Sequence, residues 1–432
     1  MPLGPVCVAW VCWVVYQTAA YVPELDALLV SWFVVLGAMA ILSLFCRKQI
    51  KNLVKECRKV VEARYLVVNL PRLSVLELLY YAFFFLIFLL VFYQILSLPF
   101  LENDSQEYVL VARHILSNGS LAAYPVTDTV LSGGLYAPSS HPPGYVMLLV
   151  WSFLTSGGDS LLHVRLASAF HFVGLLIIAF GLRHFRLREV AVAAFVMMTT
   201  PLVISMVVGY HVDGMRLMLF LAAVIWTALA IESCDLKVVT VAGAVAGFAA
   251  FSHSIGLLAI GFGGISILAF WRGRLVLRLL PAAVFGAVAV AVGGYQFVEN
   301  TVVLGAPLMD APPVFVDEAI GYTADLWARR DIDLWADKFV YGVARAWFEL
   351  SIFGLGYWAF LYLLVRNWLA GQINKDLIVI LLWIFSFFAL SVMTVLLGSE
   401  LIIKNPRYAL TTAPLVAIFV AGCLRSCRGR LQ

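Results

Sequence analysis

The sequence predicts an all-α polytopic membrane protein with a bundle of about twelve transmembrane helices. Of its 432 residues, 63% are hydrophobic and only 12% are charged, and the mean hydropathy is +0.97. This composition lies far outside that of soluble domains. Crossing a bilayer core of about 30 Å takes roughly 20 apolar residues of helix, and the apolar runs of this chain approach that length repeatedly.

The expected transmembrane helices are separated by polar or basic connections of different lengths. They lie near residues 6–22, 27–45, 77–99, 161–182, 190–209, 214–231, 238–251, 255–271, 277–298, 341–365, 377–397 and 408–423. The apolar stretch 145–155 is too short to cross and suits a re-entrant or interfacial segment. The first basic residue is Arg47, so residues 1–46 are expected to form a retained hairpin instead of a cleaved signal peptide.

Charge sets the expected orientation, because cytoplasmic loops retain Lys and Arg. Twenty of the 29 basic residues fall in residues 47–72, in alternate later connections and after the last helix, whereas 18 of the 25 acidic residues fall on the other side. Both termini are therefore expected in the cytoplasm. Residues 47–76 form a basic cytoplasmic segment that touches anionic membrane lipids, and nucleic acid is not an expected partner.

Residues 77–432 form the main transmembrane domain, with two long outer loops at residues 100–144 and 299–340. None of the seven cysteines lies in an outer loop, which excludes a disulfide framework there. Helix-start chemistry at Asn103 predicts a short amphipathic helix on the outer surface, ending at Asn118-Gly119. Its first turns carry Asp104, Glu107 and Tyr108.

The first outer loop resembles that of a known enzyme family. The pattern Asp104-Ser105-Gln106-Glu107-Tyr108, followed at a distance by His141-Pro142-Pro143-Gly144-Tyr145, is similar to the first periplasmic loop of GT-C glycosyltransferases. It most resembles the bacterial protein-mannosyltransferase-like branch, which includes lipid A aminoarabinose and galacturonic acid transferases. The later segments Tyr210-His211-Val212-Asp213 and Arg407-Tyr408 also match that family. In one departure, many relatives carry Asp-Glu where this chain has Asp104-Ser105.

The resemblance implies a GT-C-like bundle in the bacterial inner membrane. It implies a glycosyltransferase that moves a monosaccharide from a polyprenyl-phosphate donor to a lipid, glycan or protein acceptor on the periplasmic face. An alternative is a transporter or flippase of a lipid-linked or glycan substrate, which would place charges at the midplane of an internal repeat. A third is a non-catalytic scaffold. The sequence has no evident repeat, and its ionisable residues gather at one face.

The candidate site residues follow from the chemistry of sugar transfer, which needs a carboxylate at the acceptor and cations or a metal at the phosphate. The catalytic candidates are Asp104, Glu107 and Asp213. The substrate-binding candidates are Tyr108, His141, Lys404, Arg407 and Tyr408. A divalent cation, Mg²⁺ or Mn²⁺, would bind Asp104, His211 and Asp213.

Simpler interpretations stand beside these roles. Asp104 also suits a carboxylate in the first helical turn, and Lys404 and Arg407 suit side chains that extend to the membrane interface. Asp213 and Arg216 are spaced for a structural ion pair. His253 fits a histidine whose polar groups are satisfied at a helix break.

Overall fold

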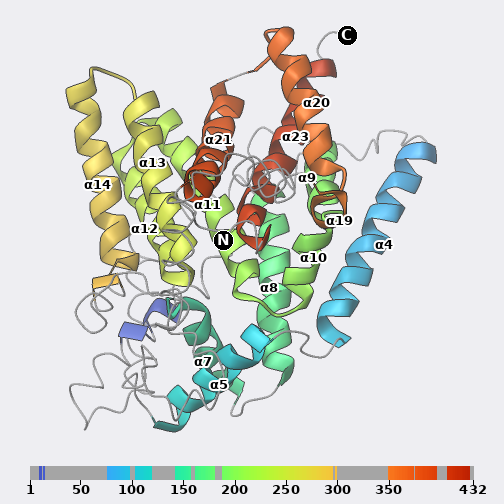
Figure 1. The fold of residues 1–432 in the computed structure, drawn as a ribbon, viewed down its shortest axis with the longest axis vertical. Helices are drawn as coiled ribbons and strands as arrows, with labels where there is room; N and C mark the ends of the chain where they lie inside the picture. Colours follow the sequence, from blue (N-terminus) through green and yellow to red (C-terminus); the bar gives the residue numbers. More distant parts are fainter. Residues whose placement is uncertain are drawn as a thin grey trace, which may run out of the picture.

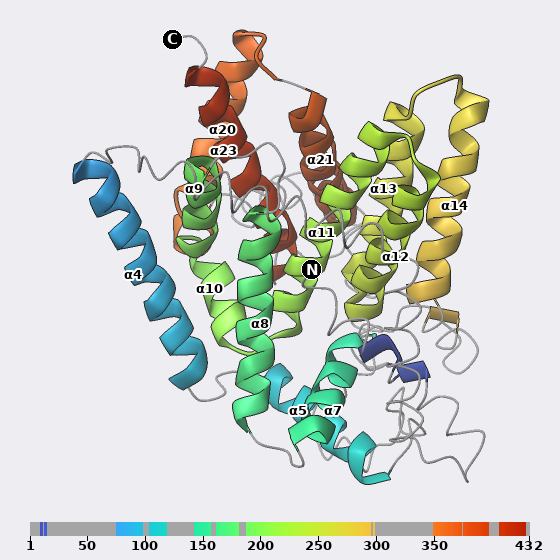
Figure 2. The same ribbon diagram turned by 180° about the vertical axis from the view of Figure 1, so that it is seen from behind.

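The computed structural model describes residues 9–11, 13–14, 75–97, 103–118, 142–156, 161–180, 187–294, 297–298, 349–373, 375–396 and 406–428. In these parts of the chain every regular element is an α-helix or a 3₁₀ helix (Figures 1 and 2). The all-α fold class is therefore confirmed. The expected spans at residues 6–22 and 27–45 and the loop at 299–340 fall almost wholly outside the described residues.

Seven helices lie within a few residues of the predicted spans. They are α4 (Val75–Ser97), α8 (Leu161–Phe180), α11 (Val212–Ser233), α12 (Leu236–Ser252), α13 (Leu257–Phe270), α14 (Leu275–Gly293) and α21 (Lys375–Leu396). Within the described ranges, α11 and α14 are long and apolar enough to cross a membrane as single helices, and one bent pair would make a third.

The predicted span at 190–209 is wrong as a single helix. It consists of α9 (Leu187–Met198) and α10 (Pro201–Val208), and the two are bent by 75° at the break. Pro201 has no backbone N–H, and the hydroxyls of Thr199 and Thr200 donate to the carbonyls of Phe195 and Val196 at 2.8 Å each. Both effects compete with continuous helix, which explains the bend.

Two further predicted spans are interrupted. The described part of 341–365 consists of α19 (Leu350–Phe353) and α20 (Gly356–Leu369), separated at Gly354, which has φ +65°. The last span opens as a 3₁₀ helix, η4 (Pro406–Thr412), before α23 (Ala413–Arg428). Pro414 cannot donate to Leu410, so the α-helical hydrogen-bond pattern is interrupted between the two.

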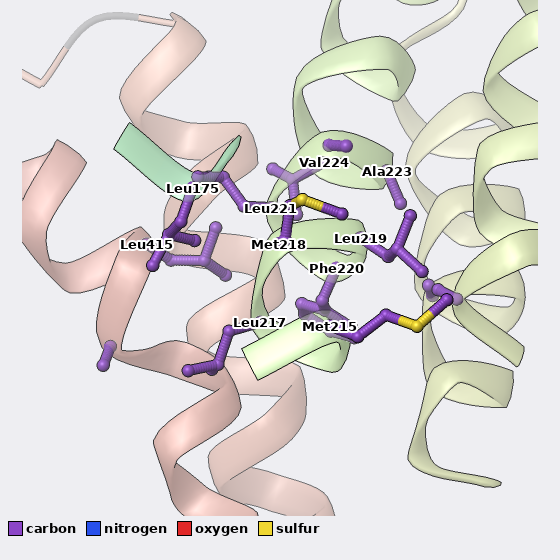
Figure 3. Packing of buried hydrophobic residues seen from close by; sticks show 14 of the residues in the cluster. Leu175, Met215, Leu217, Met218, Leu219, Phe220, Leu221, Ala223, Val224 and Leu415 are labelled. Atoms are coloured by element: carbon purple, nitrogen blue, oxygen red, sulfur yellow. The ribbon is translucent and has the colours of Figure 1, made fainter. Parts of the chain in front are cut away.

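Helix α11 lies at the centre of the bundle. Most of its residues are buried, and it packs against α8, α12, α13 and α21. Figure 3 shows Leu175 of α8 and Leu415 of α23 on one side of α11, whereas Leu219 points to the other. A helix that is buried on all sides is a core helix. Core packing of α11 therefore holds in place the residues of its first turns, which include Asp213 and Arg216.

Helices α12 and α14 approach each other closely at glycine residues. A Cβ added to Gly293 of α14 would collide with the carbonyl oxygen of Gly247 of α12. Small residues of this kind let membrane helices pack backbone to backbone. The α12–α14 pair is therefore closely packed.

The bundle has two distinct ends. Helices α5 (Asn103–Asn118) and α7 (Gly144–Ser156) lie at one end, whereas the α13–α14 and α20–α21 connections lie at the other (Figures 1 and 2). Helix α5 has the bounds that the sequence predicts. Helix α7, with 13 residues, is about 20 Å long and too short to cross a 30 Å core.

This arrangement leads to a test of orientation. Arg272, Arg274 and Lys375 are at or beside the connections at the end away from α5. A cysteine replacing the exposed Gln106 of α5 should react with an impermeant thiol reagent from outside the cell. A cysteine replacing the exposed Lys237 should react from the cytoplasm alone, both on a cysteine-free background. Labelling of position 106 from the cytoplasmic side only would reverse the predicted orientation.

Candidate functional site

Five segments that are far apart in the sequence meet at the end of the bundle that carries α5. On α5, Ser105 Oγ donates to the backbone carbonyl of Gly209 in the α10–α11 turn. At the start of α7, a Cβ on Gly144 would lie 2.6 Å from the carbonyl oxygen of Phe251, near the end of α12. The first turn of α11 is bonded to η4 through Arg216. The parts of the first loop, the α10–α11 turn, the α12 end and η4 thus form one region.

The centre of this region is a buried ion pair. Arg216 Nη2 lies 2.7 Å from Asp213 Oδ1, one helical turn away on α11. His211 Nδ1 lies 3.2 Å from the other oxygen, Asp213 Oδ2. Asp213, Arg216 and His211 are each at most 1% exposed. The Asp213–Arg216 ion pair that the sequence spacing suggested is confirmed. The Asp213 carboxylate is contacted by Arg216 at one oxygen and by His211 at the other.

Arg216 also links α11 to the beginning of the last helical segment. Its Nη2 donates to the backbone carbonyl of Arg407 at 2.7 Å, across 191 positions in the sequence. Its guanidinium carbon lies 5.8 Å from the centroid of the Tyr408 ring, and that of Arg407 lies 5.7 Å from the same ring. Tyr408 is therefore within cation–π range of both arginines.

His253 completes the cluster from the break between α12 and η2 (Ser254–Gly256). Its Nδ1 accepts the backbone N–H of Ile255 at 3.1 Å, which confirms a histidine satisfied at a helix break. The ring hydrogen of neutral His253 is therefore on Nε2, which lies 3.5 Å from Arg216 Nη1. Two hydrogen-bond donors thus lie side by side, an arrangement that an anionic oxygen between them would stabilise.

The charges of this cluster favour an anion. Two guanidinium groups, Arg216 and Arg407, and the His253 ring lie around Tyr408, and Asp213 is the carboxylate that the structure describes beside them. Asp213 neutralises one of the two positive charges. A phosphate group is the kind of ligand that such an arrangement of donors and cations binds.

Of the other predicted site residues, the structure describes some completely, some by their backbone alone and some not at all. Tyr108 is buried on α5, and its ring packs edge to face against Tyr145 of α7 with centroids 5.4 Å apart. The backbone of Asp104 and Glu107 lies in the first turns of α5, but their side chains are outside the described part. His141 and Lys404 are outside the described residues, although Pro142 and Pro143 are buried beside α7.

The predicted metal ligands are only partly described. Among the described residues, no three or more His, Cys, Asp and Glu side chains are placed to hold a metal ion. Both oxygens of Asp213 are engaged, one by Arg216 and one by His211. Because the Asp104 carboxylate lies outside the described part, binding of Mg²⁺ or Mn²⁺ stays a prediction.

Three buried residues near the site were given no role from the sequence, although two of them, Tyr145 and Tyr210, belong to the motifs that resemble the family. His171 of α8 is 1% exposed, and within the described structure neither ring nitrogen has a hydrogen-bond partner. Its ring lies 5.8 Å from that of Tyr145. Tyr145 and Tyr210 bond to backbone carbonyls, and burial raises the pKa of both phenols, so both are neutral donors at pH 7. The signal in the sequence that could have pointed to His171 is its position inside a predicted transmembrane span, where an ionisable residue is uncommon.

Comparison with known proteins identifies the fold. No protein-family model and no curated protein sequence matches the chain. Two crystal structures of ArnT from Cupriavidus metallidurans do, one bound to undecaprenyl phosphate and one in the apo state, with TM-scores of 0.53 and 0.52. Each is 15% identical to this chain.

The match covers most of this chain and a smaller share of its neighbours. It spans 82% and 81% of this chain, but 62% and 61% of the ArnT chains. At this identity the likeness establishes the fold. The chain has the fold of these ArnT structures, an all-α bundle with helices long and apolar enough to cross a membrane, as the sequence predicts.

Proposed function

We propose that the chain is a glycosyltransferase that moves a monosaccharide from a polyprenyl-phosphate donor to a lipid, glycan or protein acceptor. The reaction would take place on the periplasmic face of a bacterial inner membrane, with both termini in the cytoplasm. The observation that carries the proposal is the convergence of Arg216, His253 and Arg407 around Tyr408, beside the helix that bears Asp104. The fold supports it, since one ArnT structure of this fold is bound to undecaprenyl phosphate.

The proposed chemistry assigns one task to each side of the site. The Asp104 carboxylate accepts the proton of the acceptor hydroxyl while that oxygen bonds to the anomeric carbon of the sugar. The bond from the anomeric carbon to the phosphate oxygen breaks, and polyprenyl phosphate leaves with the bonding electrons. Arg407 and its neighbours stabilise the negative charge that grows on the phosphate. Asp213 keeps Arg216 charged and in place.

Replacing Arg407 with Ala tests the phosphate side. Loss of one charge-assisted hydrogen bond typically costs about 1.5–3 kcal/mol, so donor binding should weaken roughly ten- to hundredfold. The measurement is donor titration with purified protein in lipid nanodiscs, read as sugar transfer. The backbone carbonyl that accepts from Arg216 is retained in the variant, so the fold should persist.

Arg366→Ala provides the matched control. Arg366 is exposed in the last turn of α20, at the opposite end of the bundle, and its loss removes the same side chain without approaching the site. Donor kinetics that are unchanged in Arg407→Ala would remove Arg407 from the site. A wild-type protein that transfers no sugar from any polyprenyl-phosphate donor in a screen would contradict the function itself.

A further inference from the structure

The turn between α10 and α11 holds an unusual backbone conformation. Tyr210 has φ +60°, in the left-handed region that residues other than glycine rarely adopt. The backbone N–H of Gly209 donates to Ser205, and that of His211 donates to Met206. A conformation of this kind persists where surrounding contacts hold it, and such positions cluster at functional sites.

Three side-chain hydrogen bonds attach this turn to three other helices. Ser105 of α5 donates to the Gly209 carbonyl, and the Tyr145 hydroxyl of α7 donates to the Tyr210 carbonyl at 2.8 Å. The Tyr210 hydroxyl donates to the carbonyl of Ile95 in α4 at 2.7 Å. Ser105, Tyr145 and Tyr210 are each 1% exposed. The bonds are therefore shielded from water, and loss of a donor leaves a buried carbonyl without it.

These hydrogen bonds lie close in the sequence to both candidate carboxylates, Asp104 and Asp213. Ser105 directly follows Asp104, and Tyr210 is three residues before Asp213. Since α11 is fixed in the core, the turn is the point at which the first loop is attached to that helix. Tyr145 is held in turn by ring contacts with Tyr108 and His171.

We propose that Ser105, Tyr145 and Tyr210 are positioning residues that together fix Asp104 relative to Asp213. Ser105 and Tyr145 attach α5 and α7 to the α10–α11 turn, and Tyr210 attaches that turn to α4. The inference rests on the proposed function for its effect on turnover, but not for its effect on structure. It also gives position 105 a role that a carboxylate could not fill. An ionised side chain there would carry no hydrogen to donate to the Gly209 carbonyl and would bury a charge.

The kinetic test uses Tyr145→Phe and the double variant Ser105→Ala/Tyr145→Phe. Phe keeps the ring between Tyr108 and His171 and loses the hydroxyl alone. Because small misplacements of reacting groups reduce turnover strongly, kcat should fall roughly tenfold in the single variant and about a hundredfold in the double variant. The KM for the donor should stay nearly constant, since the phosphate is held by other segments.

Ser266→Ala is the matched control for the loss of a buried hydroxyl. Ser266 on α13 donates to the Phe262 carbonyl at 2.7 Å and accepts from Trp383, outside the turn and its attachments. It should lower the melting temperature about as much as Ser105→Ala and leave kcat unchanged. If Ser266→Ala and the double variant reduce kcat alike, the effect is one of general stability and the proposal is overturned.

A distance measurement tests the attachment without any assay of activity. Nitroxide labels at the exposed positions Gln106 of α5 and Ser205 of α10, on a cysteine-free background, report the distance between the two helices by pulsed electron resonance. The distribution should be narrow in the parent protein and broader in the double variant. An unchanged distribution in the double variant overturns the positioning role whatever the kinetics. A broadened distribution in the double variant, together with a wild-type protein that transfers no sugar from any polyprenyl-phosphate donor, would support the attachment and contradict the proposed function instead.

Discussion

Asp104→Asn is expected to reduce sugar transfer by a factor on the order of 10² to 10⁴, because loss of a general base typically has that effect. Donor affinity should change little, since the cations that would bind the phosphate belong to α11 and η4. Asn is a good residue at a helix start, so α5 should keep its beginning at Asn103. The measurement is transfer from a polyprenyl-phosphate donor, made beside donor binding and thermal melting of the same variant.

Asp235→Asn is the matched control for this substitution. Asp235 caps α12, where its carboxylate accepts the backbone N–H of Lys237 at 2.9 Å, and it is exposed. The same chemical change at that helix start should leave transfer intact. If Asp104→Asn instead lowers the melting temperature and the activity in proportion, Asp104 acts through the stability of α5 and is not the base.

The helices could be predicted from the sequence where the length and apolar character of a segment determine its structure. The span predicted at 214–231 became α11, Val212–Ser233, and the helix predicted from Asn103 to Asn118 has those bounds. Lipid demands that each crossing segment satisfy its own backbone, so composition alone is a strong signal. The breaks were missed because they depend on local competition for hydrogen bonds. The sequence Thr199-Thr200-Pro201 carried that signal.

The contacts of the site could be predicted from the sequence only where they join residues that are close together in the chain. Asp213 and Arg216 are three residues apart on one helix, so their pairing could be inferred from spacing. The bond from Arg216 to the Arg407 carbonyl joins residues 191 positions apart, and no pattern within either segment encodes it. The same holds for Tyr145 and the Tyr210 carbonyl. Such contacts depend on how helices pack, which hydropathy does not specify.

The buried ion pair of α11 gives the second large expected effect. Arg216→Met removes a cation that is 0% exposed and leaves Asp213 without its partner at 2.7 Å. Breaking a buried pair from one side typically costs about 3–5 kcal/mol, because an uncompensated charge stays in a low-dielectric interior. The variant should therefore show a large fall in melting temperature and lose transfer activity.

The double variant Asp213→Leu/Arg216→Met separates stability from function. Replacing both members of a buried pair with apolar residues of similar size is often neutral or stabilising, so the melting temperature should recover most of its loss. Transfer should not recover, because Arg216 would no longer hold the η4 backbone at the Arg407 carbonyl or supply charge beside Tyr408. Melting and transfer are measured on the wild type, both single variants and the double variant in the same lipid. A double variant that transfers sugar at the wild-type rate would make the Asp213–Arg216 pair a structural contact and confine the phosphate side of the site to Arg407 and its neighbours.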